Sequence, residues 1–132
     1  MRDETGSMLP LVAALMFVGF VIIAVGVDIA MLHRGYRASA IVADTAAEAG
    51  AAMVDVAALH DGQVALATVD ARTRASDVAR TLAPVDAEVE VELDDVRVCV
   101  RVRQRHATVA LVAVGVGTVM IDVRSCAEPR IG

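Results

Sequence analysis

The chain has 132 residues, a formal net charge of −5 and two cysteines, and 57% of its residues are hydrophobic. This acidic balance argues against a nucleic-acid partner, which would require a basic face. The aromatic residues are two Phe and one Tyr, with no Trp, so a soluble core must be built from Val, Ala and Leu. If one helix spans a membrane, roughly 100 residues remain, which is enough for one small domain.

An uncharged, almost wholly apolar run occupies residues 8–27, after a short charged leader at residues 1–7. A helix rises about 1.5 Å per residue, so this run spans about 30 Å, the thickness of the hydrocarbon core of a bilayer. We therefore expect a transmembrane helix over residues 8–32, with the lipid bilayer as its partner. A cleaved signal peptide is the alternative, although its apolar part is usually only about 7–15 residues long.

Three residues of this helix are candidates for contact with other subunits. Asp28 ends the apolar run. It is expected either to reach the lipid headgroups or to pair with the helix of a neighbouring subunit, because a buried charge in a membrane needs a partner. Gly19 and Gly26 lie close to one face, where small residues permit close approach of another helix.

The Ala-rich segment that follows predicts a continuation of the same helix over residues 33–59, bent near Gly35 or Gly50. Positions three and four apart are expected to form one packing face. This face comprises Ile41, Thr45, Ala49, Ala52, Val56 and Leu59.

A second helix is predicted over residues 64–82, after a turn at residues 60–62. Its inward side is expected to carry Ala67, Ala71, Ala75, Val78 and Leu82. Pro84 follows and closes the helix.

Alternating Val and charged residues then predict an antiparallel hairpin with strands at residues 85–93 and 96–104, around an Asp94-Asp95 turn. That turn sets acids opposite arginines, namely Glu92 with Arg97, Glu88 with Arg101, and Asp86 with Arg103. The acidic run is therefore interpreted as half of a cross-strand ladder rather than as a metal site. A third strand is expected at residues 118–126, after a stretch that is ambiguous between helix and strand.

The two cysteines both fall on the polar face of their strands. If the second and third strands are antiparallel neighbours with Cys99 opposite Cys126, then Arg103 faces Asp122, a second favourable pair from the same register. We predict a disulfide between these cysteines, which closes a long loop and is typical of compartments outside the cytoplasm. Two free thiols are the alternative.

Motifs for catalysis or metal binding are missing from the sequence. It has no Walker loop, GxSxG, HExxH or GxGxxG, and His33, His60 and His106 lack ligand spacing. We therefore expect no enzyme activity, no cofactor, no metal and no small-molecule substrate.

Four segments share the pattern of one family, namely residues 2–7, Val27-Asp28-Ile29-Ala30, Tyr36-Arg37 and residues 43–51. With the apolar helix, they resemble the N-terminus of TadE/TadG-like proteins, the minor pilins or pseudopilins of the tight-adherence (Flp) pilus system. The Val-alternating strand, the Gly-containing apolar linker and the ending Ser125-Cys126-Ala127-Glu128-Pro129 are similar to short actinobacterial-type TadE-like proteins.

These elements together predict an α+β fold, in which the membrane helix continues into a second helix and then a three-stranded antiparallel meander, and the resemblance implies that this fold is pilin-like. It also implies a cytoplasmic N-terminus, an extracytoplasmic domain at residues 33–132, and other pilins and Tad pilus assembly proteins as partners. Charge alone predicts the opposite orientation, because Arg34 and Arg37 follow the helix. Gly6-Ser7 is the candidate processing position, although the fifth residue after Gly6 is Leu11, where type IV-like prepilins carry Glu.

The function expected from these features is that of a membrane-anchored minor pilin-like subunit acting through helix packing. Two alternatives stay open. One is a membrane-tethered accessory subunit of another cell-envelope complex, and the other is an exported effector whose anchor is cleaved.

Overall fold

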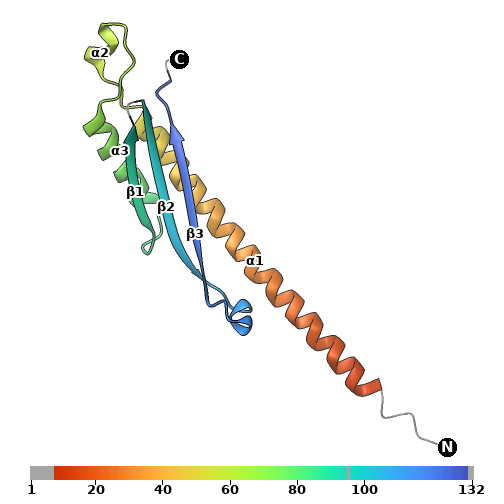
Figure 1. Cartoon of the computed structure of the whole chain (residues 1–132). Coiled ribbons are helices and arrows are strands. Elements are labelled where there is room, and N and C mark those ends of the chain that lie inside the picture. Colours follow the sequence, from red (N-terminus) through yellow and green to blue (C-terminus); the bar gives the residue numbers. More distant parts are fainter. Residues whose placement is uncertain (1–7, 95, 131–132) are drawn as a thin grey trace, which may run out of the picture.

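The computed structural model describes residues 8–94 and 96–130. The chain is an α+β protein with one very long N-terminal helix, α1 (Met8–Ala51), and a three-stranded antiparallel sheet. The second half of α1 and the helix α3 (Thr68–Leu82) cover one face of the sheet, and the first half of α1 extends away from this head as a rod (Figure 1). The charged leader at residues 1–7 lies outside the described residues.

Helix α1 is continuous through Gly35, and at about 1.5 Å per residue its 44 residues extend about 66 Å. The predicted end at residue 59 is wrong, because α1 ends at Ala51. Asp55 begins a separate short helix, α2 (Val56–His60), by accepting hydrogen bonds from the Ala57 and Ala58 amides at 2.9 and 3.4 Å. Asp is a preferred residue at this capping position, and its carboxylate satisfies amides that a helix start leaves open.

The buried face of α1 is not the predicted one. Ile41 is exposed, as are Thr45 and Ala52, whereas the residues toward the sheet and α3 are buried. This buried face comprises Asp28, Ser39, Val42, Ala43, Ala46, Ala47, Gly50 and Ala51. Small residues occur on every side of this helix, so spacing alone did not distinguish the two faces.

Helix α3 begins four residues later than predicted, because residues 63–67 run back along the chain that follows α1. Val54 and Leu66 form an isolated antiparallel bridge, and the Ala67 amide donates to the Met53 carbonyl at 2.9 Å. The turn at residues 60–62 is present, with Gly62 at a φ of 76°. Ala71, Ala75 and Ala79 of α3 are buried, while the predicted inward Leu82 is half exposed.

Strands β1 (Glu88–Asp94), β2 (Arg97–Ala107) and β3 (Thr118–Ala127) follow in the order β1-β2-β3. The predicted β1–β2 register is wrong by two residues. The observed opposed pairs of acid and arginine are Glu88 with Arg103, Glu90 with Arg101, and Asp94 with Arg97. A shift of two leaves every side chain on its own face and again pairs acids with arginines, so charge complementarity could not select between the two registers.

The start of β1 also differs from the prediction. The Ala87 amide donates to the Pro84 carbonyl at 3.0 Å, so the residues after α3 form a turn before the strand begins. At the other end of the hairpin, Asp95 of the predicted turn lies outside the described residues.

The β2–β3 register agrees with the prediction: Cys99 is opposite Cys126, and Arg103 is opposite Asp122. Between these strands the ambiguous stretch forms a single 3-10 turn, η2 (Leu111–Val114), closed by Gly115 at a φ of 89°. Val98, Val100 and Val102 of β2 are fully buried under the helices. The core is thus made of Val from the sheet and Ala from both helices.

At Gly50, α1 packs tightly against both α3 and the sheet. A Cβ atom at this position would lie 2.9 Å from Val98 Cγ1, 3.0 Å from the Ala71 carbonyl oxygen and 3.0 Å from Ala75 Cβ. Only a residue without a side chain fits between three such neighbours.

Candidate functional site

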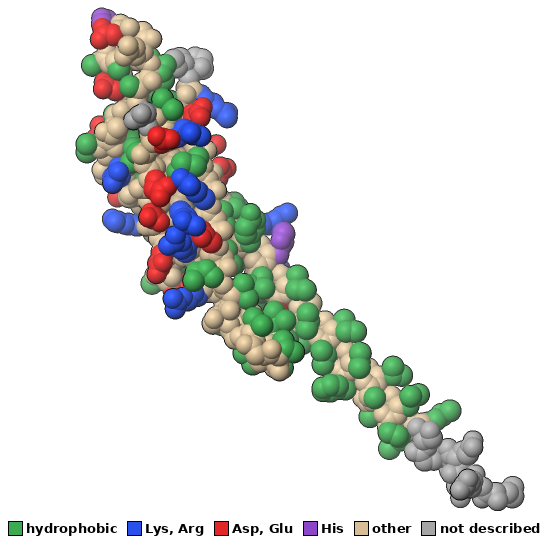
Figure 2. Space-filling view, in the orientation of Figure 1, with side chains coloured by type: hydrophobic (Ala, Val, Ile, Leu, Met, Phe, Trp, Pro, Cys, Tyr) green, Lys and Arg blue, Asp and Glu red, His purple; other side chains and the backbone are tan. Residues whose placement is uncertain are grey.

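The most prominent exposed feature is the apolar first half of α1. None of residues 8–27 is buried, and Leu9, Phe17 and Phe20 are among the most exposed large apolar side chains. Figure 2 shows this rod as hydrophobic side chains without any charge. Within the described chain, α1 is the one helix long and apolar enough to cross a membrane. Length and composition make it weak support for a membrane anchor, since a signal sequence has the same properties.

Gly19 and Gly26 lie on this rod, and a Cβ atom at either position would meet nothing within 4 Å. Neither glycine is therefore needed for contacts inside the chain. Their predicted role, contact with another subunit's helix, stays a prediction.

Asp28 lies at the junction between the rod and the head, and its side chain is bonded within its own chain. The residue is only 2% exposed. One carboxylate oxygen, Oδ1, accepts from the Val109 amide at 2.9 Å, and Oδ2 accepts from the Ala110 and Leu111 amides at 2.7 and 2.9 Å. These contacts hold the loop between β2 and β3 against α1.

This geometry gives Asp28 a partner that the sequence did not predict, because three amides of its own head occupy both carboxylate oxygens. Its expected contacts with headgroups or with a neighbouring helix stay predictions. The partner was not foreseeable from side-chain types, since the donors are backbone amides more than 80 positions away. One sequence signal could have placed Asp28 on the buried face of α1, namely the spacing of three and four that it shares with residues 32, 35, 39, 42, 46 and 50.

The face of the sheet that points away from the helices carries the two cysteines. The sulfur atoms of Cys99 and Cys126 are 2.09 Å apart, at disulfide distance, as predicted, and the pair joins β2 to β3 across 27 positions of sequence. Because this pair is on the outer face, it does not belong to the Val and Ala core beneath the sheet.

An ion-pair network surrounds the disulfide on the same face. Arg101 binds Asp122 through two hydrogen bonds of 2.8 and 2.7 Å, and Arg124 binds Glu92 at 2.7 Å. The Arg101 guanidinium holds the pKa of the Asp122 carboxyl below its ordinary value of 3.8, mainly through these hydrogen bonds. Arg103 lies near both Asp122 and Glu90, at 3.6 and 3.8 Å, so the network crosses all three strands.

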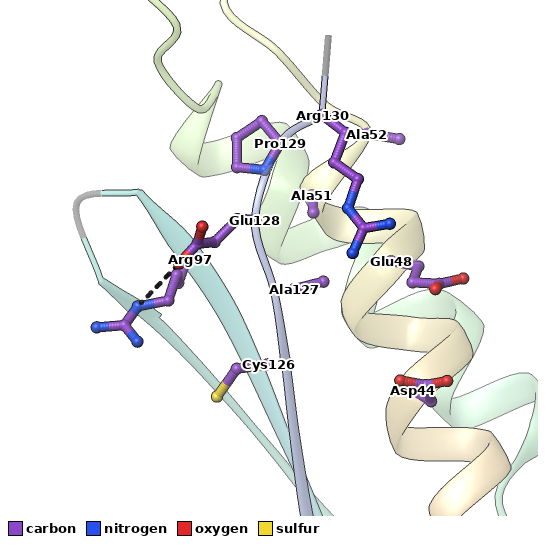
Figure 3. A pocket seen from close by; sticks show the side chains of 10 residues that line it. All are labelled: Asp44, Glu48, Ala51, Ala52, Arg97, Cys126, Ala127, Glu128, Pro129 and Arg130. Atoms are coloured by element: carbon purple, nitrogen blue, oxygen red, sulfur yellow. Dashed lines mark ion pairs between the residues drawn. The ribbon is translucent and has the colours of Figure 1, made fainter. Parts of the chain in front are cut away.

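A groove of about 570 Å³ lies beside the end of β3, next to α1. In Figure 3, Asp44 and Glu48 of α1 lie on one side of it, and Arg97 and Glu128 form an ion pair of 3.8 Å on the other. The groove is lined by both acidic and basic side chains, and its cysteine is in the disulfide. Its lining therefore has no paired nucleophile and base.

Residues of the types that bind metals are not clustered in the described chain either. In residues 8–94 and 96–130, no group of three or more His, Cys, Asp or Glu is placed to hold a metal ion. The candidate processing position, Gly6-Ser7, lies outside the described residues.

Comparisons of the chain with protein-family models, with curated proteins and with solved structures found no match. The features of this molecule that bear on its function are therefore the rod, the Asp28 junction and the disulfide-bearing sheet.

Proposed function

We propose that this chain is a membrane-anchored minor pilin-like subunit that takes part in assembly of a tight-adherence (Flp) pilus. The observation that carries the proposal is the construction of α1. Its uncharged residues 8–27 are unburied, and its second half supplies part of the core of the head. One rigid helix thus couples a segment suited to lipid or to other helices with a folded domain. The resemblance of the N-terminal segments to TadE-like proteins adds the pilus context.

In this proposal the rod is held in the membrane, and the head lies outside the cytoplasm. The Cys99–Cys126 pair supports that side, because disulfides persist in oxidising compartments and are rare in the cytosol. Helix packing is the mode of action. Van der Waals contact between small residues drives association of helices in lipid, and Gly19 and Gly26 supply such positions.

A tethered accessory subunit of another envelope complex is the second candidate, favoured by Leu11 at the position where type IV-like prepilins carry Glu. Gene neighbourhood separates the two: a secretion ATPase and paired membrane platform proteins beside the gene favour the pilus. An effector released by cleavage near residue 30 is disfavoured, because its head would lose Asp28 and leave three loop amides without their acceptor.

The test is helix packing in the host membrane. A photo-crosslinking amino acid is placed at Leu15, which is exposed on the same face of the rod as Gly19 and Gly26, and, as a control, at Val85, which is fully exposed on the head. We expect Leu15 to cross-link to other pilins or Tad proteins, identified by mass spectrometry, and Val85 to give none of these products. A strain lacking the chain should lose or strongly reduce its surface pili. Normal piliation without Leu15 cross-links would contradict the proposal.

The packing residues have a matched control. Gly19→Leu with Gly26→Leu should weaken the Leu15 cross-links without unfolding the head, since neither glycine contacts the rest of the chain. Ala13→Leu adds similar bulk about 120° away around the helix and should leave the cross-links intact. Equal loss in both variants would show that this glycine face has no special role.

A further inference from the structure

The loop that connects β2 to β3 is unusually apolar for an exposed segment. Residues 107–121 contain no charged side chain. Within them, the loop at residues 108–117 exposes several valines; Val112 is 55% and Val114 is 75% exposed. A soluble domain seldom exposes such a contiguous apolar patch without covering it.

The position of this loop is fixed relative to the rod. Its amides at residues 109–111 bind Asp28, the first charged residue after the apolar run. In Figure 1 the loop is the part of the head nearest the N-terminal half of α1, and in Figure 2 its green surface continues onto the rod. If the run at residues 8–27 spans the hydrocarbon core, the loop therefore lies at the boundary between lipid and water.

The loop also satisfies most of its own polar backbone, which lipid contact requires. Besides the three amides on Asp28, the Thr108 amide donates to the Gly117 carbonyl at 3.1 Å, and the Val116 amide donates to the Leu111 carbonyl at 3.0 Å. The Thr108 hydroxyl donates to the Val116 carbonyl. Asp28 itself is shielded by its three donors, so the junction presents no bare charge to an apolar surrounding.

We propose that the loop at residues 108–117 is a second lipid contact, seated in the interfacial layer of the bilayer beside α1. The loop and the rod together then fix the height and tilt of the head above the membrane, where a single helix would leave the head free to tilt. This inference rests on the membrane anchor of the proposed function. The occupant is lipid because the loop's apolar surface is continuous with that of the anchor and lies at its end.

The absence of Trp from the sequence allows a direct test. Single Trp residues are introduced into the full-length chain as Val112→Trp and Val114→Trp in the loop. Phe17→Trp probes the rod, and Val96→Trp probes a half-exposed position just before β2, at the opposite end of that strand from the loop. Each variant is reconstituted in phosphatidylcholine vesicles with acyl chains brominated at a shallow or a deep position, and a non-reducing gel verifies the disulfide.

Both loop tryptophans should lose fluorescence, more with the shallow than with the deep bromine. Phe17→Trp should be quenched by deep bromine, and Val96→Trp should not be quenched. Quenching of Phe17→Trp without quenching of either loop variant would overturn this inference and leave the anchor standing. No quenching of Phe17→Trp would remove the anchor and the proposed function with it.

A neighbouring copy of the chain is the rival occupant of the loop. It would give a blue-shifted loop Trp that lipid bromine does not quench, with a shift that grows as the protein-to-lipid ratio rises. That result would also overturn the lipid assignment. Loop quenching that is independent of the protein-to-lipid ratio supports it.

Discussion

Asp28 is the residue on which the junction of rod and head depends. Its two oxygens accept from three consecutive amides at residues 109–111, and its burial leaves it little access to solvent. A carboxylate that accepts several backbone hydrogen bonds makes charge-assisted contacts, which are stronger than neutral ones. The residue therefore fastens a loop that has few other contacts of this strength.

Replacing Asp28 with Asn should loosen this loop while the head stays folded. Asn keeps the shape but has one acceptor oxygen in place of two, so at least one loop amide loses its partner. Hydrogen exchange of the amides at residues 109–111 should accelerate several-fold, with β2 and the buried side of α1 unchanged. Exchange at wild-type rates in the loop would show that the three contacts do not hold it.

Gly50 is the second residue with a sharp prediction. Gly50→Ala should destabilise the head by up to about 2 kcal/mol, because overpacking of a tight site costs about 1–3 kcal/mol and the better helix propensity of Ala returns about 1. The measurement is the free energy of unfolding of the full chain in detergent, which a denaturant titration provides.

Gly35→Ala is the matched control for Gly50→Ala. Its Cβ atom would approach Ile121 Cδ1 at 2.8 Å, the far end of a side chain that can rotate away. Its effect should therefore be the smaller of the two. An equal or greater loss at Gly35 would contradict the packing described around Gly50.

The sheet carries the main electrostatic element of the head. Because Arg101 lowers the pKa of Asp122, the pair stabilises the folded state above the ordinary carboxyl value of 3.8, and this contribution is lost as the pH falls through the folded-state pKa. Both side chains are more than a third exposed, so solvent and salt screen the interaction. The contribution of the pair should also decrease in high salt.

Asp122→Asn should accordingly lower the melting temperature at pH 7 more than at pH 3. Glu88→Gln removes an acidic charge from the edge strand and is the control. A difference between Asp122→Asn and wild type that is the same at both pH values would contradict the role of the ion pair.

The strands show which elements the sequence could predict. Alternating Val and charged residues located all three strands to within a few residues, because a sheet with one wet face requires that pattern. The Cys99–Cys126 pairing followed from the same alternation. The β1–β2 register did not, because acids recur at every second position and meet arginines in either register.

The helices and the junction were harder to predict. Ala occurs on all sides of α1, so the sequence did not show which side is buried, and the capping role of Asp55 was hidden within an apparently continuous helix. The Asp28 contact needed the three-dimensional position of a loop whose donors are backbone amides, which carry no side-chain signature.

The whole molecule is a rod that enters a small two-layered head. The rod presents apolar side chains on its surface, and the head presents a charged sheet (Figure 2). A disulfide joins two strands on the outer face of that sheet. Exposure of the apolar rod to water is unfavourable, and the disulfide of the head persists in an oxidising compartment. The rod and the head therefore suit different surroundings. Retention of the rod in a bilayer, with the head on the oxidising side, is the claim on which the proposals depend.

The most direct test of that claim is thiol labelling of the native chain after cell fractionation. Membranes and cytosol are separated, and the membranes are washed with carbonate. Both fractions are then treated with a maleimide-polyethylene glycol reagent, with and without prior reduction. We expect the chain in the membrane pellet with its residues 8–27 retained in the mass spectrum, and a gel shift at both cysteines only after reduction. A cytosolic chain whose two thiols react without reduction would contradict the account.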